Sequence, residues 1–83
     1  MNAKIFWKEG CPNCPAAKEL GKKLEEKIKV EYLNIEEVDG LAEASFHGVM
    51  STPTLIVLDE NEKVLKQWNG EVPKEEEIKE LIK

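Results

Sequence analysis

The chain has 83 residues, with 17 acidic against 12 basic side chains and a net charge of −5. This length allows one domain, residues 1–83, and excludes a second core. The acidic balance and the absence of arginine argue against nucleic acid and anionic membranes as partners. Because no apolar run reaches the roughly 20 residues of a membrane span and the N-terminus lacks a signal-peptide pattern, we expect a cytoplasmic protein.

The first half of the chain predicts two strands joined by a helix. The apolar run at residues 4–7 predicts a buried strand, and a second strand is predicted over residues 30–35. Between them, Gly21 lies on the apolar stripe of an amphipathic helix, where it would let the helix approach a sheet closely. The other members of that stripe recur at helical spacing: Ala17, Leu20, Leu24 and Ile28.

A short second helix is predicted after the second strand. Asp39 is a candidate cap for its start, and Gly48 is a candidate stop. We expect this helix to turn three apolar residues inward: Leu41, Ala42 and Phe46.

The second half of the chain predicts a hairpin and a last helix. The apolar run Thr54–Leu58 predicts a central strand, and an acidic turn leads from it to a strand over residues 63–69. Pro73 suits the first position of a last helix, whose core-facing residues would be Ile78, Leu81 and Ile82. The resulting order, β-α-β-α-β-β-α, predicts an α/β fold with helices on both faces of a mixed sheet.

Cys11 and Cys14 are the only cysteines, and they lie between the first strand and the first helix. The N-terminus of a helix favours a thiolate, which is the reactive form in thiol–disulfide exchange. We expect Cys11, the more exposed sulfur, to attack and Cys14 to resolve the mixed disulfide. Lys8 and Lys18 would add positive charge if they point toward the pair.

Other roles for the cysteine pair stay open. A structural disulfide across so short a loop would contribute only about 2 kcal/mol. A zinc site needs four ligands, and His47 is the single histidine, so a site would require carboxylates or a second chain. A third possibility is two buried, inert thiols.

Two segments resemble the thioredoxin-fold superfamily. Residues 6–18 contain Cys11-Pro12-Asn13-Cys14 and are similar to the glutaredoxin pattern Lys-x-x-Cys-Pro-x-Cys-x-x-Ala-Lys. Residues 46–55 are similar to the thioredoxin run Tyr-Gly-Val-x-Ser-x-Pro-Thr-Leu. The resemblance is to short archaeal and bacterial members of the family, and it implies a four-stranded mixed sheet flanked by three helices.

The resemblance also implies a function and a site. The activity would be reduction of protein disulfides by the Cys11–Cys14 dithiol, without a metal and with no cofactor besides this redox-active disulfide. Pro53 would be a cis-proline beside the dithiol, and the Thr52 backbone would pair with an extended client segment. The remaining substrate-binding residues would be Trp7, Lys8, Pro12 and Asn13.

The implied partners are oxidised client proteins and an electron donor, either a flavin-dependent thioredoxin-type reductase or a small thiol. We expect a monomer. The alternative function is a thioredoxin-fold binding module that uses the cysteine pair to hold a metal or to dock a partner. Two departures from the glutaredoxin pattern argue against glutathione as the electron donor. Asn13 stands where glutaredoxins have Tyr, and residues 68–72 do not match their glutathione-binding turn.

Overall fold

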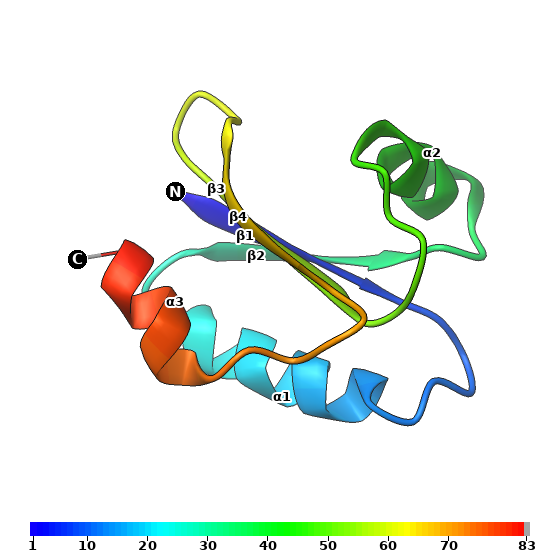
Figure 1. Ribbon diagram of the computed structural model, residues 1–83, viewed down its shortest axis with the longest axis horizontal. Helices are drawn as coiled ribbons and strands as arrows, with labels where there is room; N and C mark the ends of the chain where they lie inside the picture. The colour runs from blue at the N-terminus through cyan, green and yellow to red at the C-terminus, as the bar shows by residue number, and fades with distance from the viewer. Residues whose placement is uncertain (83) are drawn as a thin grey trace.

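The computed structural model describes residues 1–82 and contains one four-stranded sheet (Figure 1). The strand order is β2-β1-β3-β4. β1 pairs in parallel with β2 and antiparallel with β3, and β3 pairs antiparallel with β4, so the predicted mixed sheet with its terminal hairpin is confirmed. The strands are β1 (Asn2–Trp7), β2 (Lys29–Asn34), β3 (Thr54–Leu58) and β4 (Val64–Asn69).

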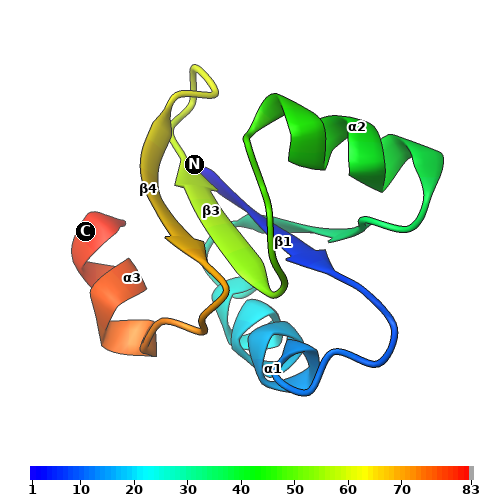
Figure 2. The same ribbon diagram turned by 45° about the vertical axis from the view of Figure 1, so that its right-hand side comes forward.

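Three helices cover the two faces of the sheet: α1 (Cys14–Leu24), α2 (Val38–Phe46) and α3 (Glu75–Leu81). α1 and α3 lie on one face and α2 on the other (Figures 1 and 2). Successive side chains of β1 point to opposite faces of the sheet, as they do along any strand. Ile5 belongs to the core under α1 and α3, and Phe6 belongs to the core under α2. Both faces of β3 are therefore covered, and all five of its residues are buried.

α1 begins at Cys14, with Asn13 as its N-cap. Pro15 is the second helical residue. Its missing N–H is one that would have had no intrahelical partner, so it is tolerated there. Gly21 makes the predicted close approach, since a Cβ at this position would lie 2.7 Å from Ile5 Cδ1.

The end of α1 comes earlier than its apolar stripe predicts. The helix ends at Leu24, and a turn in which the Ile28 N–H donates to the Leu24 carbonyl leads into β2. The chain must leave the helix here because Lys29 already pairs with Asn2 in the sheet. Ile28 is half-buried against the core from this turn rather than from the helix.

The structure corrects the expected start and end of α2. Its N-cap is Glu37, and Asp39 lies inside the first turn without capping it. The Asn34 side chain accepts a hydrogen bond from the Glu36 N–H, and its carbonyl accepts one from the Glu37 N–H. This local turn starts the helix earlier than expected. α2 ends at Phe46, two residues before Gly48, whose φ is +67°.

The predicted inward face of α2 is also wrong. Leu41 is 55% exposed and Phe46 is 82% exposed, and Ala42 is exposed as well. The face that meets the sheet is made of Gly40 and Ala44. A Cβ at Gly40 would overlap the backbone carbonyl of Asn34, so only glycine fits at the closest point. The helix packs by its small residues, and its larger apolar side chains point away from the sheet.

α3 begins at Glu75 with Lys74 as its N-cap, so Pro73 is buried just outside the helix instead of at its first position. The Glu77 carboxylate accepts a hydrogen bond from the Lys74 N–H, an arrangement that places the cap at Lys74. Ile78 is buried as predicted. The helix ends at Leu81, and Ile82 is its half-buried C-cap.

A salt bridge between β1 and α2 ties this helix to the sheet. Lys4 of β1 is buried and donates to the Glu43 carboxylate of α2. The hydrogen bond from Lys4 lowers the pKa of Glu43, although burial opposes it, and the charges of Lys4 and His47 add to the lowering. Burial alone would lower the pKa of Lys4, but the hydrogen bond and charge of Glu43 raise it, with help from more distant carboxylates.

These shifts predict a pH-dependent stability. A lowered carboxyl pKa stabilises the fold fully above the ordinary value of 4.5, and this is lost as the pH falls through the lowered value. Glu43→Gln should lower the free energy of unfolding at neutral pH by about 1–2 kcal/mol, because it leaves the buried Lys4 ammonium without its carboxylate. The cost stays this small because Glu43 is partly exposed and water screens the interaction. In urea titrations this difference should shrink below about pH 4.

The control is Glu37→Gln, which removes an exposed carboxylate from the N-cap of the same helix. It should leave the free energy of unfolding unchanged within about 0.5 kcal/mol. A difference between Glu43→Gln and the parent that stays the same from neutral to acid pH would contradict the assignment.

No helix within residues 1–82 is long and apolar enough to cross a membrane.

Candidate active site

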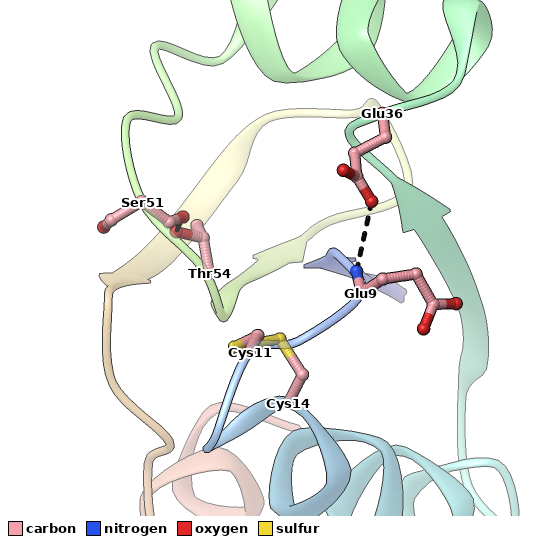
Figure 3. The surroundings of a disulfide bond; sticks show 6 residues. All are labelled: Glu9, Cys11, Cys14, Glu36, Ser51 and Thr54. Carbon is pink, nitrogen blue, oxygen red and sulfur yellow. Dashed lines mark hydrogen bonds between the residues drawn. A yellow bond between two sulfur atoms is a disulfide. The ribbon is translucent and has the colours of Figure 1, made fainter.

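Cys11 and Cys14 form a disulfide at the start of α1 (Figure 3). Their Cα atoms are 5.4 Å apart. Cys14 is the first helical residue, and Cys11 precedes the helix in the loop that leaves β1. Gly10, at φ +77°, takes a left-handed backbone conformation just before Cys11, which glycine adopts without strain. Cys11 is 8% exposed and Cys14 is 3% exposed, so the expected difference in exposure is present but small.

The chain entering β3 passes close to this disulfide (Figure 3). The Thr52–Pro53 peptide bond is cis, the isomer that the resemblance implies. Pro53 is buried and Thr52 is half-buried. The Thr54 hydroxyl donates to the Ser51 carbonyl over 2.8 Å, which holds the segment in a tight turn at the start of the strand.

A hollow of about 210 Å³ lies beside the two sulfurs, lined by residues between positions 7 and 18. It brings together two of the predicted substrate-binding residues, Trp7 and Lys8, with both cysteines. The other predicted members, Pro12, Asn13, Thr52 and Pro53, lie next to the pair in the chain or at the start of β3 and do not line the hollow.

Lys18 also lines the hollow, stacked on the face of Trp7. Its Nζ lies 3.3 Å from the ring centroid, a cation–π contact. Lys18 is four residues after Cys14 on α1, a spacing that places two residues on the same helix face. This spacing is the feature of the sequence that indicates Lys18 as a site residue. Its cation–π contact with Trp7 was not predicted. Within the described residues, the buried indole N–H of Trp7 has no hydrogen-bond partner.

This geometry makes Lys18 a testable positioning residue for the thiolate. In Lys18→Met, the rate at which the reduced protein attacks a small neutral disulfide at about pH 6.5 should fall about two- to fivefold, because a nearby positive charge that favours the thiolate is lost. Lys22→Met removes the same charge one helical turn further from the site and should leave the rate unchanged. Equal effects in stopped-flow measurements of the two variants would indicate a general charge effect instead.

A carboxylate that the sequence analysis did not single out also reaches this region. Glu36, just after β2, accepts a hydrogen bond from the Glu9 N–H over 3.2 Å (Figure 3). This hydrogen bond connects the loop before Cys11 to the residues that follow β2.

His47 does not line the hollow. It is the C-cap of α2, and its ring makes edge contacts with Phe6 and Phe46. Within residues 1–82, no three or more His, Cys, Asp or Glu side chains gather in a way that would hold a metal ion.

The strand order, the placement of helices on both faces and a Cys-x-x-Cys disulfide at the start of the first helix define a thioredoxin fold. A family model described as "Thioredoxin domain" matches residues 1–83. The chain is 35% identical over 81 residues to thioredoxin of Bacillus subtilis (strain 168), an alignment that covers 93% of this chain and 74% of the relative. The chain belongs to the thioredoxin family.

Solved structures agree with this assignment. A mutant thioredoxin from Halobacterium salinarum NRC-1 superposes with a TM-score of 0.81 at 25% identity, covering 98% of this chain and 70% of that one. Thioredoxin 1 from Thermosipho africanus TCF52B shares the fold, with a TM-score of 0.68 at 22% identity over 99% of this chain and 86% of that one. With its cysteines paired in a redox-active disulfide, the protein is a thiol–disulfide oxidoreductase.

Proposed function

We propose that this protein reduces disulfide bonds in other proteins by a dithiol mechanism. The observation that carries the proposal is the Cys11–Cys14 disulfide at the start of α1 in a chain of the thioredoxin family. A disulfide that spans so few residues contributes little stability, so its formation and cleavage can proceed without loss of the fold.

The proposed reaction balances in two steps. The Cys11 thiolate attacks one sulfur of the client disulfide, forming a Cys11–client disulfide and expelling the other client sulfur as a thiolate. Cys14 then loses its proton and attacks the Cys11 sulfur, which forms the Cys11–Cys14 disulfide and releases the second client thiolate. Two electrons pass to the client. The slightly greater exposure of Cys11 supports its role as the attacking group.

The client segment would lie across the start of β3. The Thr52 backbone, before the cis-proline Pro53, is proposed to pair with it in an extended conformation. Pro12, Asn13, Lys8 and Trp7 would contact it around the disulfide. Such backbone pairing provides affinity for many client sequences, because it uses groups that every extended segment presents.

The disulfide itself would carry the electrons, so the proposal requires no further cofactor. The partners would be oxidised client proteins and either a flavin-dependent thioredoxin-type reductase or a small thiol that restores the dithiol. We place the activity in the cytoplasm and expect the protein to act as a monomer.

The reduction potential of the Cys11–Cys14 couple tests this function. The metal-free protein should equilibrate reversibly with dithiol/disulfide buffers in a two-electron transition near roughly −270 mV, the range of thioredoxin. A value near roughly −200 to −230 mV would instead favour glutathione as the electron source. The absence of a reversible transition would overturn the proposal, and release of tightly bound zinc by a chelator would point to the metal-binding alternative.

A further inference from the structure

The outward side of α2 and the loop after it carry exposed large apolar side chains. Val38 is 84% exposed and Met50 is 92% exposed. With Leu41 and Phe46, they form what we call the outer apolar patch. On α2 the patch lies outside the face of Gly40 and Ala44 that packs on the sheet. Several exposed apolar groups of this size on neighbouring segments are typical of an interaction surface.

The charges around the outer apolar patch have a single sign. Residues 36–50 contain four carboxylates and no lysine or arginine. Glu43 is neutralised by its salt bridge to Lys4, and three other carboxylates are exposed near the start of α2: Glu36, Glu37 and Asp39. An acidic margin beside an apolar surface is complementary to a partner with apolar and basic side chains.

The outer apolar patch continues along the chain to the disulfide. α2 ends at Phe46, Met50 follows in the loop, and the segment from Ser51 to Thr54 comes next, close to Cys11 (Figure 3). A polypeptide that lies on the patch and follows this loop therefore reaches the reactive sulfurs.

We propose that the outer apolar patch docks the client, as a polypeptide segment whose apolar residues are flanked by Lys or Arg beside the disulfide to be reduced. This inference rests on the proposed function, because it names the class of client that the site accepts. A second copy of the chain is a poorer occupant, since it would bring an equal set of carboxylates and another net charge of −5 to the interface.

The test uses the reduced full-length protein and three disulfides. Two are synthetic peptides with one intramolecular disulfide and the same Leu and Phe residues, flanked in one peptide by Lys and in the other by Glu. The third is bis(hydroxyethyl) disulfide, which is small and neutral. The Lys peptide should react at least about tenfold faster than the Glu peptide, and raising the salt from about 0.05 to 0.5 M should reduce that ratio.

The patch itself is tested with the double variant Phe46→Ser/Met50→Ser. The ratio of the Lys-peptide rate to the bis(hydroxyethyl) disulfide rate should fall at least about fivefold, because apolar contacts with the peptide are lost. The matched control is Val64→Ser/Leu65→Ser, which removes two exposed apolar side chains from β4 and should leave the ratio unchanged.

Three outcomes would overturn the docking proposal. One is an unchanged ratio in Phe46→Ser/Met50→Ser, and another is an equal fall in the β4 control. The third is sedimentation data in which the parent is a dimer and Phe46→Ser/Met50→Ser a monomer, since the patch would then be a self-interface. If the parent reduces none of the three disulfides, the proposed function itself fails, a result distinct from the other three.

Discussion

Cys14→Ser should accumulate a covalent complex with a client protein, whereas Cys11→Ser should accumulate none. The reason is the order of the two attacks. With Cys11 intact, the first exchange forms the Cys11–client disulfide, but no second thiol is present to resolve it. With Cys11 replaced, the remaining sulfur belongs to the first turn of α1 and is only 3% exposed, so it is poorly placed to reach a client. Both variants should lose catalytic turnover completely.

Non-reducing gel electrophoresis and mass spectrometry of the variants, mixed with a protein that has one accessible disulfide, would measure the complex. Dithiothreitol should reduce the mixed disulfide and so separate the complex. The double variant Cys11→Ser/Cys14→Ser is the background control. Equal trapping by the two single variants would mean that the roles of attacking and resolving cysteine are wrongly assigned. Trapping only by Cys11→Ser would mean that they are reversed.

Phe6→Ala and Phe46→Ala should differ by several kcal/mol in the free energy of unfolding, although the chemical change is the same. Phe6 is fully buried between the sheet and α2, so its removal should cost about 3–5 kcal/mol through lost burial and the cavity left behind. Phe46 is 82% exposed at the end of α2, and its replacement should change stability by no more than about 0.5 kcal/mol.

Urea unfolding followed by circular dichroism would compare the two variants with the parent. For a domain of this size the cost at Phe6 is a large part of the whole stability, so complete unfolding of Phe6→Ala also meets the expectation. A large loss of stability in Phe46→Ala would contradict the outward orientation of α2 and, with it, the outer apolar patch.

Much of the fold could be predicted because its signals are local. The run at Thr54–Leu58 is apolar without interruption, which indicates a strand covered on both faces, and all its residues are buried. Gly21 interrupts the apolar stripe of α1 with the one residue that fits against Ile5 and Tyr32. The Cys11–Cys14 spacing likewise pointed to the chemistry without any tertiary information, since it needs only the start of one helix.

The orientation of α2 could not be predicted from such signals. Hydrophobicity alone favours burial of the larger apolar residues, Leu41 and Phe46. In the structure Gly40 and Ala44 face the sheet instead. The helix lies against the Asn34 carbonyl at the end of β2, where a side chain at position 40 does not fit. That constraint comes from the path of the backbone.

The electrostatic contacts of the fold and of the site also depended on the tertiary structure. Lys4 and Glu43 are 39 positions apart, and nothing in the sequence pairs them. Trp7 and Lys18 belong to a strand and a helix that meet only when the loop through Cys11 closes. The sequence by itself determined the elements, their order and the reactive cysteines. Which side chains surround those cysteines, and which face of α2 meets solvent, was decided by the packing of helices against the sheet, because those contacts join distant parts of the chain.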